Sequence, residues 1–264
     1  MTHEPNDPVG AALPRTSTPH IFKDRTAAGE QLAERLLSLL ARPFVIAAIP
    51  RGGIAVALPI VERLQRPLAI VHACKLTAPA APELAFGALD EDGQATVDRQ
   101  TVARLTLGPE VIASAKARVE AEIRRRIALY KGHPLTQYLP GPDVILVDDG
   151  LATGLTMHIA VAYARRHGAR EVTVAVPCAS EEAAVRFRQE ADRFVSLIVG
   201  DAFGAVGGYY ADFAALTDED VSAMLARVEA TPVSEFDSTG KYAAQRCRED
   251  APARSGRGGA RPAS

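Results

Sequence analysis

Two adjacent acids follow a short apolar run and precede a loop rich in glycine and hydroxyl residues. Residues 144–156 read Val-Ile-Leu-Val-Asp-Asp-Gly-Leu-Ala-Thr-Gly-Leu-Thr. Where such a loop opens a helix, its backbone N–H groups can bind a phosphate that glycine lets approach closely. Asp148 and Asp149 would repel a phosphate, so we expect them to face sugar hydroxyls or a divalent cation. The pattern therefore indicates a site for a sugar 5-phosphate.

A simpler interpretation of the same segment is a plain turn, because Asp-Gly is common in turns. A turn accounts neither for the apolar strand before the acids nor for the Ala-Thr-Gly after them. Competing motifs are absent from the sequence, which contains no Walker loop, GxGxxG, GxSxG or HExxH. The sugar-phosphate interpretation is the one we carry forward.

Basic residues follow two other predicted buried strands. Arg51 and two glycines come after 44–49, and Lys75 ends the strand predicted at 68–75. Ligands of parallel sheets bind beyond the carboxyl ends of the strands, so both residues are expected near the acids. Either one can also be an ordinary surface residue.

The elements that must position these residues alternate between strand and helix. Strands are predicted at 44–49, 68–75, 144–147, 172–176 and 194–199; helices at 24–42, 53–64, 109–130, 154–167, from 181 and from 217; and a hairpin at 84–89 and 94–97. This order predicts an α/β fold with a mainly parallel central sheet and helices on both faces. The hairpin and long helix form an insertion at about 84–131.

Composition narrows the class of protein. The chain has 264 residues, 47% hydrophobic and 23% charged, which suits a soluble globular protein with one main core. A net charge of −2 gives no electrostatic support for nucleic-acid binding. The sequence has no stretch of about 18 apolar residues, no signal-peptide pattern at its start and no CxxC pair. We expect a reduced, cytoplasmic protein folded over 21–230, with disordered tails at 1–20 and 231–264.

At this point the sequence resembles the type I phosphoribosyltransferases. Residues 144–156 are similar to that family's motif for phosphoribosyl pyrophosphate (PRPP), and 49–54 (Ile-Pro-Arg-Gly-Gly-Ile) resembles its pyrophosphate loop. Cys74-Lys75-Leu76 ends a predicted strand, where many members place a basic contact to pyrophosphate. Together with 83–88, these features resemble a bacterial subgroup of mostly unassigned substrate, and the similarity runs over about 22–226.

The resemblance implies transfer of ribose 5-phosphate from PRPP to a nitrogen nucleophile, with release of pyrophosphate and with Mg²⁺ as cofactor. Such a reaction must fix the 5-phosphate, grip the ribose and neutralise the leaving group. The 5-phosphate is assigned to Gly150, Leu151, Ala152, Thr153, Gly154 and Thr156. The catalytic residues are Asp148, Asp149, Arg51 and Lys75, and pyrophosphate is assigned to Arg51, Gly52, Gly53 and Lys75. Mg²⁺ is expected to bind mainly through PRPP, with Asp148 and Asp149 as further candidate ligands.

The acceptor is expected under a hood region at about 200–213. Phe203, Tyr209 and Tyr210 can stack on a planar ring, although Tyr210 suits a packed core equally well. Ala152 stands where 6-oxopurine transferases carry an acid, which disfavours hypoxanthine and guanine. Adenine-, uracil- and orotate-type acceptors stay open.

The alternative function is a regulator that keeps the fold and senses PRPP or a nucleotide without catalysis. Regulators of that kind usually carry a basic nucleic-acid face or an added DNA-binding domain, and the charge balance favours the enzyme. The expected partners are PRPP and a small acceptor, with no membrane. The basic residues of 109–130 fit a solvated face, a homodimer contact or an arginine lent to the site.

Overall fold

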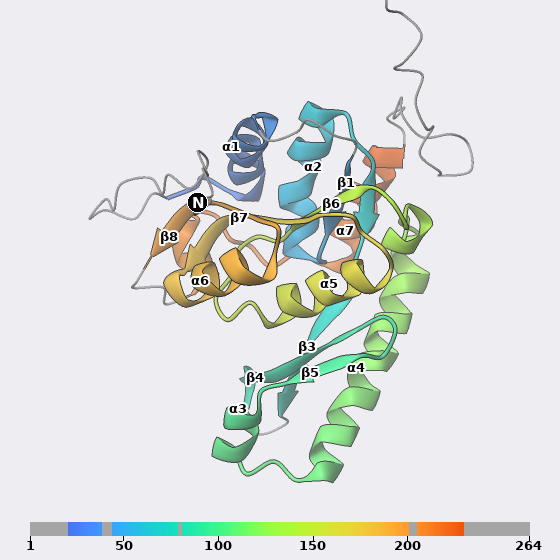
Figure 1. Cartoon of the computed structure of the whole chain (residues 1–264), viewed down its shortest axis with the longest axis vertical. Helices are drawn as coiled ribbons and strands as arrows, with labels where there is room; N and C mark the ends of the chain where they lie inside the picture. The colour runs from blue at the N-terminus through green and yellow to red at the C-terminus, as the bar shows by residue number, and fades with distance from the viewer. Residues whose placement is uncertain (1–20, 39–43, 79–80, 201–204, 230–264) are drawn as a thin grey trace, which may run out of the picture.

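A parallel sheet of five strands forms the centre of the protein (Figure 1), in a computed structural model that describes residues 21–38, 44–78, 81–200 and 205–229. The strand order is β2-β1-β6-β7-β8. The strands are β1 (Phe44–Ala48), β2 (Leu68–Ile70), β6 (Asp143–Val147), β7 (Val172–Ser180) and β8 (Arg193–Gly200). The inner strands are buried almost throughout, as expected of a sheet covered on both sides.

Helices cover both faces of this sheet, which confirms the predicted α/β fold. Apolar residues of α1 (Arg25–Leu37), α2 (Gly52–Leu64) and α7 (Asp218–Glu229) pack into one buried cluster. Residues of α5 (Leu155–Arg166) and α6 (Glu181–Glu190) pack into another, on the opposite face (Figure 1). Pro59 lies inside α2, which has nearly the predicted bounds.

The helix starts follow the sequence signals. Asp24 caps α1 by accepting a hydrogen bond from the N–H of Ala27 at 2.8 Å. The Thr217 hydroxyl accepts from the N–H of Asp220 at 3.1 Å, and the Asp220 carboxylate accepts from the N–H of Thr217 at 2.8 Å. This reciprocal pair fixes the start of α7, where a helix was predicted.

A second, antiparallel sheet follows β2 and contradicts the single strand predicted at 68–75. The N–H of Val71 donates to Ala48, which is the last contact with β1 along this segment, and from Ala73 the chain pairs with β4 instead. This sheet contains β3 (Ala73–Ala78), β4 (Ala81–Asp90) and β5 (Ala95–Val97). Lys75 therefore lies in the second sheet, and this unit begins at Ala73 rather than at about residue 84.

A long helix gives the second sheet its own core. The short α3 (Arg99–Arg104) leads into α4 (Pro109–Tyr130), which has the predicted bounds. Ala115, Val119 and Ile123 pack against Leu76, Phe86 and Leu89 of the sheet. Val111 is half-buried and Ile127 is exposed, so the buried face against this sheet runs from Ala115 to Ile123. Two short 3₁₀ turns, Leu135–Gln137 and Val206–Tyr209, complete the described elements.

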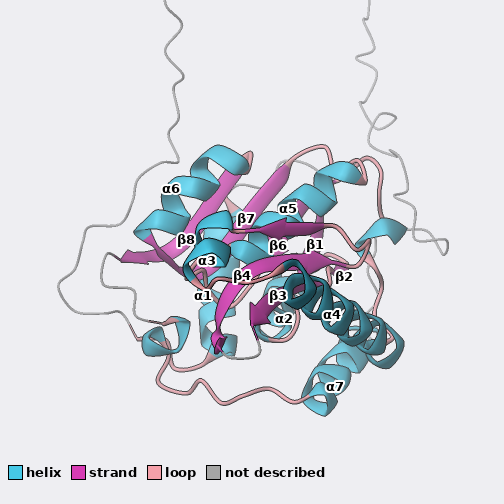
Figure 2. Ribbon diagram, turned by 90° about the horizontal axis from the view of Figure 1, so that it is seen from below, coloured by secondary structure: helices cyan, strands magenta, loops and turns pink. Residues whose placement is uncertain are grey.

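Ion pairs hold the turn between β4 and β5 against α5, one of the helices that cover the central sheet. The Arg166 guanidinium contacts the carboxylates of Asp90 and Asp92 at 2.7 and 2.9 Å. Arg166 is the last residue of α5, and the loop that contains Asp148 and Asp149 lies directly before α5. One helix therefore connects the hairpin to the candidate site. Figure 2 shows β3 and β4 in front of the central sheet, with α4 alongside.

Three segments for which the sequence made predictions cannot be compared with the structure. The predicted tails at 1–20 and 231–264, and residues 201–204 of the hood region, lie outside the described residues. Among the helices that are described, none combines the length and apolar character needed to cross a bilayer.

Candidate active site

The loop 148–156 lies between the end of β6 and the start of α5 and is anchored on β7. The Leu151 N–H donates to the Cys178 carbonyl and the Leu151 carbonyl accepts from the Ser180 N–H, both at 2.9 Å. The Ser180 hydroxyl donates to the Ala152 carbonyl at 2.8 Å. The Leu151 N–H, one of the predicted phosphate donors, is therefore engaged in the fold, and the remaining donors lie nearer to α5.

The start of α5 is a suitable anion site because no side chain caps it. The first N–H groups of a helix lack partners within the helix, and its dipole favours a negative charge there. Ala152 and Thr153 are exposed and Thr156 is half-buried, so both predicted hydroxyl donors remain accessible.

Glycines in this loop serve the fold as well as any ligand. Gly154 has φ +68°, and a Cβ there would lie 2.5 Å from Cε2 of Phe187. A Cβ at Gly150 would lie 2.7 Å from a methyl carbon of Val206. A side chain added at either position would therefore disturb the packing of the protein, whether or not a ligand is bound.

Asp149 is held by an arginine that the sequence did not reveal. The Arg25 Nε donates to Asp149 Oδ2 at 2.9 Å, and the two side chains are only 12% and 16% exposed. The Arg25 guanidinium also lies 3.8 Å from the centre of the Phe213 ring, and its Nη1 donates to the Ala214 carbonyl at 2.9 Å. One arginine thus joins the start of α1, the acid pair and the segment after the hood.

Asp148 forms no ion pair among the described residues. Its Oδ1 accepts from the N–H of Asp149 at 2.9 Å. Burial and the neighbouring Asp149 charge raise the pKa of Asp148 well above its usual range, while Lys75 and Arg25 oppose the shift. The pKa of Asp149 is also raised by burial, against the opposing effect of Arg25. The motif's two acids therefore lie in different environments.

The Arg51 loop packs directly against the acid pair. The N–H of Ile49 donates to Val147 at 3.0 Å, which continues the pairing of β1 with β6. A Cβ on Gly52 would lie 1.9 Å from Asp149 Oδ2, and one on Gly53 would lie 2.5 Å from the Val147 oxygen. These two glycines thus let the start of α2 approach the acids.

Of the predicted pyrophosphate donors, one is already bonded within the protein. The Gly53 N–H donates to the Ile49 carbonyl at 3.1 Å. The Arg51 side chain is 41% exposed, and the peptide bond that precedes it is cis. Lys75 is exposed on β3, and its charge acts on both aspartates. The fold therefore places Lys75 near the acids, although Lys75 lies in the second sheet and not in the central one.

The predicted acceptor residues are packed in a small core. Tyr209 and Tyr210 are both buried in a cluster with Phe22 and Cys178. The Tyr210 ring centre lies 5.4 Å from that of Phe22 and 5.0 Å from that of Phe213, and its hydroxyl donates to the Asp149 carbonyl at 2.6 Å. Tyr210 is therefore part of a packed core in this structure, which is the second of the two roles that the sequence left open. Phe203 lies outside the described residues.

Arg25 left one faint sequence signal. It is the first residue of α1, where the helix dipole disfavours a positive charge, and no acid occupies that first turn. A basic residue in such a position implies a partner elsewhere, but the sequence alone does not say which carboxylate it is.

Comparisons with known proteins identify the family of the chain. A family model described as a phosphoribosyl transferase domain matches residues 23–214. The chain belongs to the phosphoribosyl transferase family. The matched range includes both candidate loops, Lys75 and the whole second sheet, whereas α7 lies beyond it.

Among relatives of this phosphoribosyl transferase domain are two curated proteins from Mycobacterium tuberculosis, strains H37Rv and CDC 1551 / Oshkosh, each named "Putative phosphoribosyl transferase". Each is 37% identical over 207 residues, which covers 78% of this chain and 47% of the relative. The chain thus spans about half the length of the curated relatives it matches. The crystal structure of TT1426 from Thermus thermophilus is 39% identical, with a TM-score of 0.63, and covers 78% of this chain and 98% of that one.

The side chains around the acid pair fit a Mg²⁺ ion that is coordinated mainly by the phosphates of a bound substrate. No cluster of three or more His, Cys, Asp or Glu side chains suited to a metal occurs among the described residues. Asp149 already bonds to Arg25, which leaves Asp148 as the acid without an arginine partner. Mg²⁺ often binds through one or two carboxylates together with substrate phosphates, and Asp148 is the residue that would supply such a carboxylate.

Proposed function

We propose that this chain transfers ribose 5-phosphate from PRPP to a nitrogen nucleophile and releases pyrophosphate. One observation carries the proposal: the uncapped start of α5, the acid pair and the glycines of the Arg51 loop pack together, and the charge of Lys75 acts on both acids. These features meet the three requirements of the reaction, which are a fixed 5-phosphate, a gripped ribose and a neutralised leaving group.

The 5-phosphate is assigned to the start of α5. The free N–H groups of this helix and the hydroxyls of Thr153 and Thr156 supply donors for its oxygens. A phosphate held there fixes one end of the sugar, so the rest of PRPP extends past Asp148.

The ribose is assigned to Asp148, with Asp149 in a supporting role. A carboxylate beside the ring accepts hydrogen bonds from the sugar hydroxyls and stabilises the positive charge that develops as the C1–oxygen bond breaks. The Arg25 ion pair holds Asp149 in place and limits the charge that the second carboxylate adds to the site.

Pyrophosphate is assigned to Arg51, Lys75 and the N–H of Gly52 at the start of α2. Negative charge grows on the leaving oxygen during transfer, and these cations stabilise it. Mg²⁺ bound to PRPP adds charge neutralisation at the phosphate oxygens, and Asp148 is the side chain best placed to contact it. Retention of both basic residues with the full acidic motif supports an enzyme rather than a sensor.

The test is pyrophosphate release from PRPP across a panel of nitrogen acceptors with Mg²⁺ present. Adenine, uracil and orotate head the panel, and hypoxanthine and guanine are included because Ala152 disfavours them. We expect release with at least one acceptor, lost in Asp148→Asn. Calorimetry with PRPP and Mg²⁺ supplies the independent measurement. Absence of binding at millimolar PRPP would refute the proposal.

A further inference from the structure

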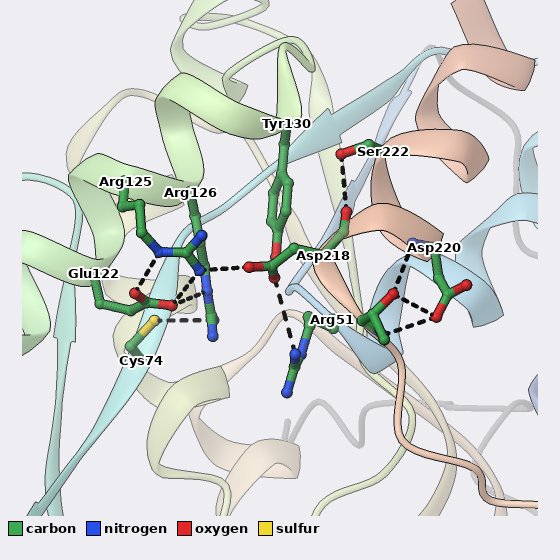
Figure 3. Close-up of polar contacts among 10 residues, drawn as sticks. Arg51, Cys74, Glu122, Arg125, Arg126, Tyr130, Asp218, Asp220 and Ser222 are labelled. Atoms are coloured by element: carbon green, nitrogen blue, oxygen red, sulfur yellow. Dashed lines mark hydrogen bonds and ion pairs between the residues drawn. The ribbon is translucent and has the colours of Figure 1, made fainter.

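The guanidinium of Arg51 lies close to a carboxylate at the start of α7. Arg51 Nη1 is 3.9 Å from Asp218 Oδ1, and the Asp218 side chain is 16% exposed (Figure 3). The family match ends at residue 214, so this contact joins the candidate pyrophosphate loop to a helix outside the matched domain. Figures 1 and 2 place α7 beside the C-terminal end of α4.

Asp218 is itself fixed by two donors from α4. The Tyr130 hydroxyl donates to Oδ1 at 2.6 Å, and Arg125 Nη2 donates to Oδ2 (Figure 3). Both bonds lower the pKa of Asp218, so its carboxylate carries a charge at neutral pH. The Tyr130 ring is buried and stacks on His72, with 6.0 Å between the ring centres. The carboxylate therefore has a defined position and orientation.

The distance from Arg51 to this carboxylate is too long for a hydrogen bond. Asp218 thus attracts the guanidinium without occupying its N–H donors, which remain available to a ligand. A half-exposed arginine otherwise samples many rotamers, and it loses that freedom on binding. A fixed negative charge behind the guanidinium reduces the loss.

We propose that Asp218, held by Tyr130 and Arg125, is a positioning residue for Arg51, which makes α7 part of the pyrophosphate site. The inference rests on the proposed function, because it assumes that Arg51 binds the leaving group. Asp218 contacts no substrate in this scheme and acts only through Arg51.

The test is a double-mutant cycle on the binding of magnesium pyrophosphate, measured by calorimetry with the full chain. Asp218→Asn removes the charge but keeps an oxygen that can accept from Tyr130. We expect this change to weaken pyrophosphate binding about fivefold in the wild-type background. In the Arg51→Ala background the same change should have no effect. Asp218→Glu, which restores the charge, should recover part of the loss.

Asp220→Asn is the matched control. Asp220 lies on the same helical turn and accepts from the Thr217 N–H and hydroxyl, both at 2.8 Å. Its removal takes the same charge from α7 and weakens the helix start, yet pyrophosphate binding should stay at the wild-type value. Binding of ribose 5-phosphate should be unchanged in all of these variants.

Three results would overturn the positioning role. An equal loss from Asp218→Asn in both backgrounds would mean that Asp218 acts through the fold. Tighter pyrophosphate binding in Asp218→Asn would mean that it competes with the ligand for Arg51. A different result, in which Arg51→Ala binds pyrophosphate as well as the wild type, would remove the pyrophosphate loop from the proposed function and the positioning role with it.

Discussion

Replacing each acid of the pair by asparagine should separate a structural carboxylate from a catalytic one. Asp149→Asn removes the charge opposite Arg25, whose Nε lies 2.9 Å from Oδ2, with both side chains largely buried. A hydrogen bond to a charged group contributes about 1.5–3 kcal/mol, and breaking a fully buried ion pair costs about 3–5 kcal/mol. Since asparagine still offers an oxygen to Arg25, we expect a loss of about 2–3 kcal/mol.

Asp148→Asn should have the opposite balance. The pKa of Asp148 is raised by burial and by Asp149, so the folded protein is destabilised when this carboxyl ionises. Asparagine removes that cost, and stability should stay equal or increase. Turnover should fall about 10²-fold or more if the carboxylate stabilises a cationic ribose.

The pH dependence follows from the direction of the shift. A carboxyl whose folded pKa is raised binds more protons in the folded state, so its contribution to stability decreases as the pH rises above about 4, the unfolded value. The advantage of Asp148→Asn over the wild type should therefore be largest at neutral pH and disappear toward pH 4.

Thermal unfolding and pyrophosphate release are the two assays, run on both variants. A loss of about 2–3 kcal/mol corresponds to a decrease in Tm of about 4–12 °C for a domain of this size. Arg25→Gln should produce a similar decrease, and adding Asp149→Asn to it should cost little more. Equal decreases in Tm for Asp148→Asn and Asp149→Asn would refute the division of roles.

Three further predictions concern the loops and the metal. Gly154→Val should lower Tm by several degrees, since its side chain would meet Phe187 and its φ is +68°, whereas Thr153→Ala should weaken PRPP binding and leave Tm unchanged; calorimetry and thermal unfolding on both variants check this. Arg51→Ala should cost about 2–4 kcal/mol in transition-state stabilisation and weaken pyrophosphate inhibition while ribose 5-phosphate binding is kept, and equal losses for both ligands in titrations would contradict the loop assignment. Removal of Mg²⁺ by EDTA should abolish tight PRPP binding and leave the Tm of the ligand-free protein unchanged, since few side chains here can hold a metal alone.

The sequence predicted most elements of the central domain because their signals are local. Asp24 caps α1, Gly168 with φ +89° follows the C-terminal end of α5, and apolar runs form the buried strands. The strand predicted at 68–75 was wrong because an apolar run does not show where a strand leaves its sheet. That change depends on the pairing of Ala73 with Asp90, which lies far along the chain.

For the candidate site, the motif identified which loops converge but not how adjacent residues divide their roles. Asp148 and Asp149 have the same chemistry in the sequence, and only the fold places Arg25 beside one of them. The contact joins residues 124 positions apart, so no local pattern encodes it. The same limit applies to Tyr210, whose ring suits a ligand or a core until its neighbours are known.

The loop with Asp148 and Asp149 and the loop with Arg51 are both contacted by charged residues outside their own sequence motifs. Arg25, at the start of α1, takes one carboxylate of the acid pair, and Asp218, at the start of α7, lies behind the arginine of the other loop. The two contacts have opposite polarity: a cation supports the acidic loop and an anion supports the basic loop. Under the proposed function, each loop would present its charge to the ligand from a supported position, which limits the reorganisation needed as charge develops during transfer. Since these supports come from the first and last helices of the described residues, motif residues alone are not expected to reproduce the site in a shortened protein.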